Sequence, residues 1–313
     1  MPLSLRRGRV TAVLERHEGL VRLEVDGIAC VAYPRLTGPV ALGDEVLVNE
    51  QARLLGLGSG GFDVLHVNLT RGLGLEPEPG AHVMTLPYTP LQSAVRHAEE
   101  EAEPAESLGG MPVVCCSLHS QVAPVCAALA GRRLAYVQLP GGALPVALSD
   151  VVRTLKERGL LGVAVAAGGC TDGDVQCVSA ASALAWAAAA GYEAVVCSVG
   201  PGIVGTGTRL GHGGLAAAEA ANAAAALGGR AVIAPRVSEA DARERHRGLS
   251  HHTRAVLDLC LGEVLVPDDL EPDGWRESCE GLPLSHMGRG PREDPSFFAA
   301  AFAAGLVARG LLP

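Results

Sequence analysis

Aromatic residues are scarce in this sequence and make up only 3% of its 313 residues. Small β-domains that bind single-stranded nucleic acid stack the bases on aromatic side chains, and the phosphate backbone favours a basic surface. This chain instead has a formal net charge of −9. RNA binding by its amino-terminal part would depend on Arg6, Arg7 and Arg9 alone. We therefore expect no nucleic-acid partner.

The sequence also lacks a long apolar run that is free of charged and turn-forming residues. Residues 178–197 come nearest, but Gly191, Tyr192 and Glu193 interrupt them. This stretch predicts a core helix followed by a buried strand rather than a membrane span. The first residues do not have the apolar segment of a secretory signal. We therefore expect no membrane partner and a cytoplasmic location.

The common metal-binding spacings are missing as well. The nine cysteines include no CxxC pair, and Cys170 and Cys177 are separated by TDGDVQ, a spacing not typical of zinc sites. The adjacent Cys115 and Cys116 suit disulfides poorly, so we expect reduced thiols that behave as small buried hydrophobes. HxH and HExxH pairs are absent too. The identity of any metal or cofactor is unknown at this stage.

The composition, with 48% hydrophobic and 19% charged residues, is typical of a globular protein. Residues 1–75 alternate short apolar runs with turn signals, which predicts a small all-β, barrel-like domain. Residues 76–110 contain glycines, Glu-Pro pairs and an acidic run, as is typical of a connector. Residues 111–313 follow a different rhythm and form the third predicted part.

From residue 111 onward, apolar runs alternate with segments of helical length. The runs are MPVVCCS, RLAYVQL, LGVAVAA, EAVVCSV, RAVIAP and GEVLVP. A glycine precedes each strand after the first, where a left-handed cap would end the helix before it: Gly131, Gly159, Gly191, Gly228 and Gly262. The pattern predicts an α/β fold with a doubly wound, mostly parallel, Rossmann-like sheet and a carboxyl-terminal helix.

Polar residues gather after the predicted strands rather than before them. His119 and Ser120 follow the first strand, and Asp172 and Asp174 follow the third. A glycine-rich loop follows the fourth strand, and residues 236–253 follow the fifth. Because the carboxyl ends of parallel strands share one edge of the sheet, we expect a ligand site at this edge.

The glycine-rich loop VGPGIVGTGTRLGHGG, residues 199–214, contains seven glycines. Its GPGIVG resembles the dinucleotide-binding pattern GxGxxG, but Pro201 and the position after the fourth strand argue against dinucleotide binding. A phosphate-binding P-loop is disfavoured as well, because Thr206 and Gly207 stand where it needs Lys and Ser or Thr. Such a loop before a helix either presents backbone amides to an anion or only makes a tight turn. The candidate anion ligands are Gly202, Gly205, Thr206, Gly207, Thr208 and Arg209.

The stretch RERHRGLSHHT, residues 243–253, is the second candidate. Ser250 is the expected N-cap of a helix, which places His251 and His252 in the first turn, where a positive group needs a carboxylate or a bound anion nearby. Arg247, Ser250 and His252 are therefore further candidate ligands. Imidazoles titrate near neutral pH, so the candidate catalytic acids or bases are His119, His212, His246 and His251. A metal site could also draw on His119, His212, Asp172 and Asp174.

Five stretches of this part carry a family resemblance: SLHSQVAPVCAAL, PGGALPVALS, GPGIVGTGTRLGHGGLAAAEAANAAAALGG, PRVSEADARERHRGLSHHT and SHMGRGPREDPSFF. Together with the amino-terminal LTGPVALGDEVLVNEQARLLGLGSGGFDVLHVNL they resemble a bacterial family of uncharacterised proteins, the domain of unknown function 3866. The resemblance implies that these segments belong together in one protein family, and it implies no particular reaction. This chain has AAGGCTDGD where the family has an aromatic-containing loop, so the resemblance gives Asp172 and Asp174 no role.

Two kinds of function fit these residues. In the first, an enzyme binds a small anionic metabolite that bears phosphate or carboxylate, and a histidine acts as acid or base. In the second, a non-catalytic ligand sensor or assembly protein binds an effector at the same edge. A serine hydrolase is disfavoured because Ser120 lies outside a GxSxG elbow. The expected partner is a small anion, and the alanine-rich residues 215–227 either pack on the sheet or mediate a homo-oligomer.

Overall fold

The computed structural model describes residues 3–56 and 60–313. The chain divides into two compact units, Met1–Arg96 and His97–Pro313. The segment predicted as a connector, residues 76–110, contains a short antiparallel pair, β6 (Val83–Thr85) and β7 (Ser93–Val95), and the 3-10 helix η1 (Ala98–Glu100). Within the described ranges, the structure contains no helix with the length and apolarity to cross a bilayer.

The first unit is built on a closed five-stranded barrel, as the alternating pattern predicts. Its strands follow the order β1-β2-β3-β5-β4. They are β1 (Leu5–His17), β2 (Leu20–Val25), β3 (Ile28–Ala32), β4 (Glu45–Asn49) and β5 (Asp63–Asn68), with the short helices α1 (Pro34–Thr37) and α2 (Gln51–Leu54) between them. Irregular register at residues 10–12 and 13–15 lets the long β1 bend, because a bulge sharpens the twist of a strand.

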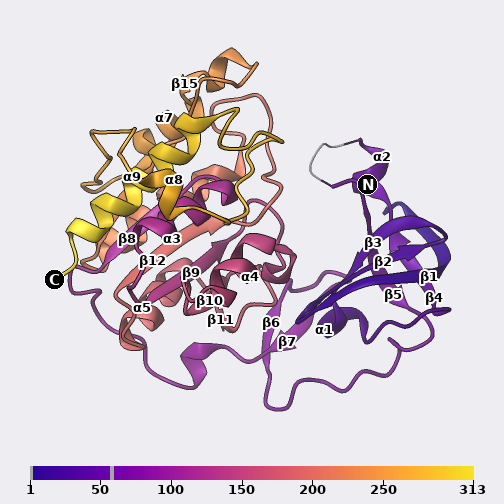
Figure 1. The fold of residues 1–313 in the computed structure, drawn as a ribbon. Helices are drawn as coiled ribbons and strands as arrows, with labels where there is room; N and C mark the ends of the chain where they lie inside the picture. Colours follow the sequence, from indigo (N-terminus) through magenta and orange to yellow (C-terminus); the bar gives the residue numbers. More distant parts are fainter. Residues whose placement is uncertain (1–2, 57–59) are drawn as a thin grey trace. The chain divides into compact units, whose positions relative to one another are not determined.

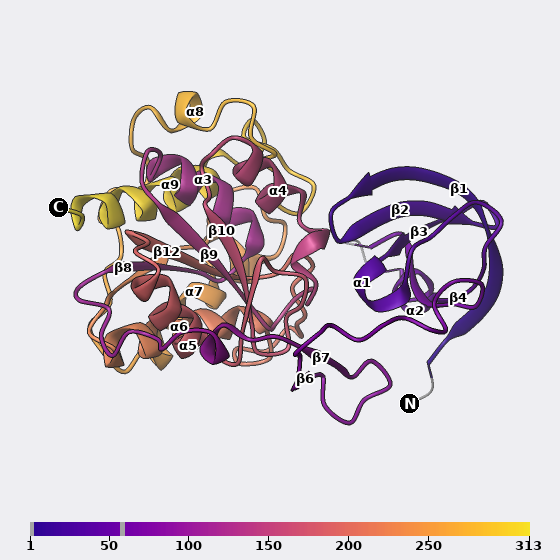
Figure 2. The same cartoon turned by 90° about the horizontal axis from the view of Figure 1, so that it is seen from below.

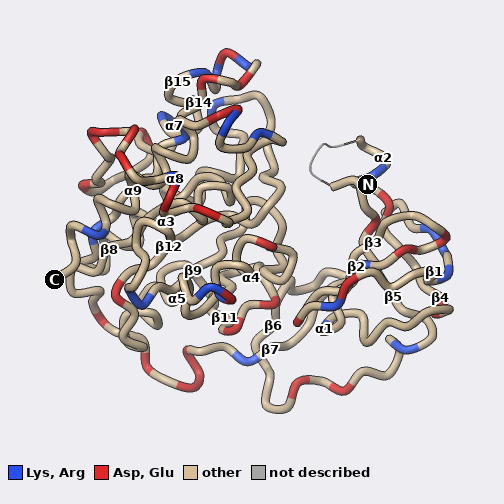
Figure 3. The backbone as a smooth tube through the Cα atoms, in the orientation of Figure 1, with Lys and Arg blue, Asp and Glu red and all other residues tan. Residues whose placement is uncertain are grey.

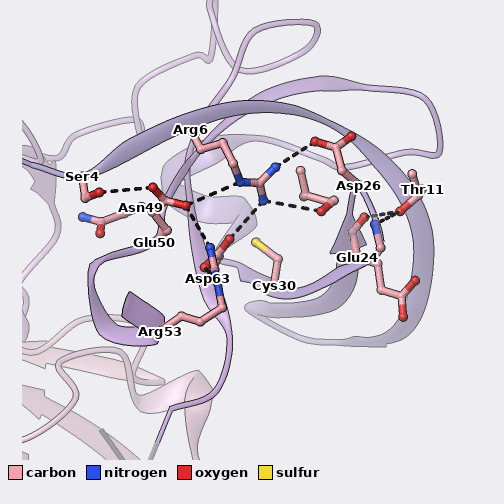
Figure 4. A network of polar contacts seen from close by, with 12 residues as sticks. Ser4, Arg6, Thr11, Glu24, Asp26, Cys30, Asn49, Glu50, Arg53 and Asp63 are labelled. Atoms are coloured by element: carbon pink, nitrogen blue, oxygen red, sulfur yellow. Dashed lines mark hydrogen bonds and ion pairs between the residues drawn. The ribbon is translucent and has the colours of Figure 1, made fainter. Parts of the chain in front are cut away.

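A buried carboxylate links β5 to β1 and α2 (Figure 4). The side chain of Asp63 is fully buried and lies 3.1 Å from Arg6 Nη2 and 2.7 Å from Arg53 Nε. Glu50 contacts the same two arginines, at 3.7 Å and 2.8 Å. The two guanidinium groups thus compensate a charge that would otherwise be buried without a partner.

We expect Asp63→Ala to destabilise the first unit by about 3 kcal/mol, because removing one partner of a buried pair leaves the other uncompensated. Chemical denaturation followed by circular dichroism measures this. Asp26→Asn is the control, because Asp26 also pairs with Arg6, at 2.8 Å, but its side chain is 46% exposed. Asparagine tolerates the left-handed φ of this position, so the change removes only the charge. We expect the control to change the free energy of unfolding by less than about 1 kcal/mol. Equal effects of the two variants would contradict the prediction.

The second unit is built on a six-stranded, all-parallel sheet of order β11-β10-β9-β12-β8-β13 (Figure 1). The strands are β8 (Pro112–Cys116), β9 (Leu134–Leu139), β10 (Val163–Ala167), β11 (Val175–Cys177), β12 (Ala194–Val199) and β13 (Arg230–Ala234). The predicted fold class, an α/β sheet preceded by a barrel, is confirmed. β12 lies between β8 and β9, although it follows both of them in the chain.

Helices cover both faces of this sheet (Figure 2). One face packs against α3 (Val122–Ala128), α4 (Asp150–Glu157), α8 (Trp275–Ser278) and α9 (Pro295–Gly310), and the other against α5 (Ala180–Ala189), α6 (Ala216–Ala226) and α7 (His251–Leu259). Successive residues of a strand point to opposite faces, so Cys115 and Cys116 belong to different core clusters. All nine cysteines are free thiols. The predicted helix and strand in residues 178–197 are confirmed as α5 and β12.

Three sequence-based expectations for this unit are wrong. Residues 262–267 make only one isolated bridge, Val232 to Leu265, because Pro267 has no N–H to donate and residues 261–263 are exposed. The sixth strand is β11 instead, which is too short to stand out as an apolar run. Gly262 does not have the left-handed conformation found at the other four predicted caps, Gly131, Gly159, Gly191 and Gly228.

The third correction concerns Asp174. Its carboxylate accepts from the backbone N–H of Ala164 at 2.8 Å and pairs with Lys156 at 2.5 Å. Ala164 is near the amino end of β10, so Asp174 lies at the opposite edge from the one predicted. The chain turns back after β10 to form β11, and this reversal carries Asp174 away from the carboxyl edge.

Candidate functional site

Three neighbouring strands bring the predicted polar segments together at the carboxyl edge of the sheet. β8 pairs with β12 on one side and with β13 on the other. The glycine-rich loop follows β12 and residues 236–253 follow β13, so the two segments meet across the end of β8. In the tube view, basic and acidic residues alternate around β14 (Val237–Ser238), β15 (Gly248–Leu249) and α7 (Figure 3).

The glycine-rich loop packs backbone against backbone with the turn after β9. A Cβ on Gly200 would overlap the carbonyl oxygen of Ala143, and a Cβ on Gly213 would overlap that of Gly141. The amide of Val204 donates to Gly141 O at 3.0 Å. These contacts explain several of the glycines by close approach alone.

Beyond this contact the loop forms a hairpin-like projection. Gly205 bridges His212, and the amide of Gly213 donates to Val204 O at 2.9 Å. The predicted anion ligands of the loop are exposed on the projection: Gly202, Gly205, Thr206, Gly207, Thr208 and Arg209. Arg209 pairs with Asp258 of α7 at 2.6 Å. His212, at the base of the projection, is 6% exposed and faces inward.

Four histidines from the two segments lie in ring contact. His212 stacks on His252 with a centroid distance of 3.7 Å, and His251 lies 4.5 Å from His252 and 5.7 Å from His212. The ring of His246, from the 3-10 helix η5 (Glu244–His246), is 4.8 Å from His251 and 4.9 Å from His252. The predicted convergence of His212 with the histidine-rich stretch is therefore present.

Ser250 connects the two ends of the histidine-rich stretch. It caps α7 as predicted, because its hydroxyl accepts from the backbone N–H of His252 at 3.2 Å. The same hydroxyl lies 2.8 Å from His246 Nδ1. Ser250 thereby fixes the orientation of one imidazole relative to the helix that carries the next two. Arg247, the remaining predicted ligand of this stretch, is exposed.

A buried ion-pair network adjoins the histidines. Asp241, 2% exposed, receives three guanidinium groups at 3.2 Å, 2.8 Å and 3.5 Å: those of Arg236, Arg243 and Arg289. Arg289 also pairs with Asp294 at 3.1 Å. Arg236 Nη1 donates to His252 Nδ1 at 3.2 Å, which joins the network to the imidazoles. We call the whole set the histidine–arginine cluster: His212, Arg236, Asp241, Arg243, His246, His251, His252, His286, Arg289 and Asp294.

The imidazoles of the cluster are neutral at pH 7. Burial, reinforced by the nearby arginines, lowers the pKa of His246 and His286 to about 3. Burial and the neighbouring His212 lower the pKa of His252 to about 2. Burial also lowers the pKa values of His212 and His251. Each neutral ring therefore keeps one lone pair, and that of His252 accepts from Arg236.

Several buried polar atoms of the cluster have no hydrogen-bond partner among residues 3–56 and 60–313. They are both ring nitrogens of His212, Nε2 of His251 and His286, Nε of Arg236 and Oδ1 of Asp294. Arg236 is only 2% exposed. Buried polar groups are rarely left unpaired in folded proteins, so this concentration of them makes the cluster the candidate site of the second unit.

His119, the fourth predicted acid or base, has different neighbours. Its Nε2 lies 2.6 Å from Ser149 Oγ at the start of α4, and its Nδ1 lies 3.3 Å from the Tyr136 hydroxyl of β9. Both ring nitrogens are thus engaged away from the four clustered histidines. Ser120 does not pair with His119 and instead lies 3.3 Å from His286 Nδ1.

The burial of His119 predicts a pH dependence of protein stability. Burial lowers its pKa to about 4 in the folded protein, whereas an unfolded histidine titrates near 6.5. Between these values only the unfolded state is protonated, so stability falls as the pH drops from 6.5 towards 4 and is unaffected by His119 above this window. We expect His119→Gln to remove about 1.5 kcal/mol of the loss between pH 6.5 and pH 5. Urea denaturation at the two pH values measures it, and identical losses in both proteins would contradict it.

Residues missed by the sequence analysis supply the charges of the site. Arg236 follows β13 almost directly, and Asp294 immediately precedes α9. Arg236 could have been recognised as a candidate site residue, because it is a charged residue that follows a buried apolar run. No local pattern shows that residues 286–294, which follow α8, return to the same edge.

The fold and the cluster define an α/β protein with a buried polar site at the carboxyl edge of its parallel sheet. The chain belongs to the family described as "Protein of unknown function (DUF3866)", whose model matches residues 29–274. The segment with His286, Arg289 and Asp294 lies beyond the matched residues. No curated protein matches the chain.

Proposed function

We propose that the chain binds a small anionic metabolite, bearing phosphate or carboxylate, in the histidine–arginine cluster. The observation that carries the proposal is the charge balance of the cluster. Among the described residues, the guanidinium groups of Arg236, Arg243 and Arg289 pair with two carboxylates, those of Asp241 and Asp294. The surrounding imidazoles are neutral. The one positive charge in excess lies with Arg243 and Arg289, whose side chains are 37% and 22% exposed and so accessible to a ligand. It favours an anion as its partner.

The arginines also favour this class of ligand by their shape. A guanidinium group presents a planar fork of donors that matches phosphate and carboxylate. Arg236 has a buried Nε that finds no acceptor within the described part of the chain. Neutral His212 and His251 beside it are suited to move a proton to or from the bound molecule, which is the enzymatic form of the proposal.

Isothermal titration of the full chain with inorganic phosphate and with malonate, in the presence of EDTA, tests the anion site. Arg243→Gln is the informative variant because its side chain is 37% exposed and therefore tolerates replacement. We expect it to weaken binding by about 10-fold or more, since a charge-assisted hydrogen bond is lost. Arg230→Gln is the matched control, because Arg230 begins β13 at the opposite edge and is exposed.

A third variant, Arg209→Gln, distinguishes an anion site on the glycine-rich loop from one in the histidine–arginine cluster. Loss of binding in Arg209→Gln together with wild-type affinity in Arg243→Gln would place the anion on the projecting loop and overturn the cluster site. Absence of saturable binding for both anions would overturn it as well. For a metabolite that binds, conversion observed by NMR and abolished in His212→Gln identifies an enzyme, and binding without conversion identifies a sensor.

A further inference from the structure

Three of the clustered histidines lie close enough to one another to share one metal ion. One ligand atom each from His246, His251 and His252 can be chosen so that all lie within 4.8 Å of one another. Their ring centroids are 4.5 to 4.9 Å apart. Three imidazoles that bind one ion at about 2.1 Å hold their ring centres about 5 Å apart, so these rings already have about the right separation, and their nitrogens need only turn towards a common point.

The ring nitrogens of His246 and His251 are placed so that each ring can offer one nitrogen to an ion. Ser250 Oγ contacts His246 Nδ1 at 2.8 Å, which leaves Nε2 for an ion and holds the ring in place. His251 Nε2 is buried and finds no hydrogen-bond partner in the described ranges. Arg236 donates to His252 Nδ1, so the neutral ring carries its proton on Nε2. Ligation through Nε2 therefore requires that this proton move to Nδ1 and that the Arg236 contact be released.

We propose that His246, His251 and His252 bind one divalent transition-metal ion of the zinc type. Three nitrogen ligands suit such ions and suit calcium or magnesium poorly, because those prefer oxygen. Three protein ligands leave a fourth, open position, as in catalytic zinc sites. His212 stacks on His252 and so adjoins the three proposed ligands. The inference goes beyond the proposed anion binding, since the metal site can form without the anion.

Each of the neighbouring arginines is paired with a carboxylate, which reduces its repulsion of the ion. Arg236 and Arg243 both pair with Asp241, and Arg289 pairs with Asp294. A bound ion would add to the positive charge of the cluster and so favour the anion further. We therefore expect metal and anion each to increase the affinity of the other by the same factor, because binding linkage is reciprocal.

The test is titration of chelator-treated, full-length protein with ZnCl₂ alone, with no anion added beyond a non-coordinating buffer. We expect one saturable site, and at least about 100-fold weaker binding in His246→Gln and in His251→Gln. His251 is half-buried, so its variant remains informative if His246→Gln folds poorly, which circular dichroism checks. His66→Gln in the first unit is the matched control and should bind as the wild type does.

A spectroscopic readout distinguishes the histidines from the cysteines. With Co²⁺ in place of Zn²⁺, visible d–d bands typical of four-coordination and no thiolate charge-transfer bands are expected. Charge-transfer bands would assign the metal to cysteine and overturn the proposal. So would the absence of saturable Zn²⁺ binding, or equal affinity in the wild type and His251→Gln. The phosphate titration in EDTA contains no free metal, so the two proposals fail independently.

Discussion

Replacing Asp241 with asparagine is expected to destabilise the second unit by about 3–5 kcal/mol, because it leaves buried guanidinium charge without its main partner. Asp241 is the residue on which Arg236, Arg243 and Arg289 converge. Hydrogen bonds from Arg243 hold the pKa of this carboxyl well below its usual range. Its contribution to stability is therefore fully present at neutral pH and is lost only as the pH falls through that low pKa.

Thermal and urea denaturation measure the effect, which corresponds to a fall in melting temperature of about 10 °C for a unit of this size. Asp258→Asn is the matched control, because Asp258 pairs with Arg209 while both side chains are more than half exposed, at 55% and 59%. We expect the control to change the free energy of unfolding by less than about 1 kcal/mol. A loss below about 1 kcal/mol in Asp241→Asn would show that the arginines are solvated or paired elsewhere.

Gly213→Ala is expected to be the most damaging change in the glycine-rich loop, with a loss of about 3 kcal/mol or more. The added Cβ would overlap the backbone of Gly141, which cannot rotate away as a side chain could. Separation of the two backbones would also displace the adjacent His212 from His252. We therefore expect weaker Zn²⁺ and phosphate binding in the fraction of this variant that folds.

Gly207→Ala provides a control within the same loop. A Cβ at Gly207 meets no atom within 4 Å, and its φ is not in the left-handed region. We expect a change of less than about 0.5 kcal/mol in its free energy of unfolding, as is usual for an exposed site. Denaturation of both variants under the same conditions gives the comparison. Equal losses in Gly207→Ala and Gly213→Ala would show that general loop flexibility matters more than close backbone approach.

Much of the fold could be predicted from the sequence, because most strands of the second unit are separate apolar runs. Five runs became strands of the sheet, and four glycines ended helices in the left-handed conformation. The failures have a common cause. Residues 262–267 are as apolar as a strand but have few groups able to pair, whereas β11 has only three residues and depends on pairing with β10.

The candidate site was only partly predictable. His212, His246, His251 and His252 stand out as polar residues after predicted strands, and Ser250 stands out as a helix cap. Asp241 and Arg289 do not, because their role depends on partners 5 to 48 positions away. His119 lies at the predicted strand end, but its ring points towards Tyr136 and Ser149. Tertiary packing decides this orientation, so the sequence alone does not predict it.

The sequence by itself determined which segments become strands and helices, since apolar periodicity, caps and left-handed glycines act over a few residues. The tertiary structure alone decided that β12 and β13 lie on either side of β8. That strand order places a loop histidine against three histidines from a segment more than thirty residues later in the chain. Strand order is set by how the helices pack over the whole sheet, a long-range free energy that no local pattern encodes.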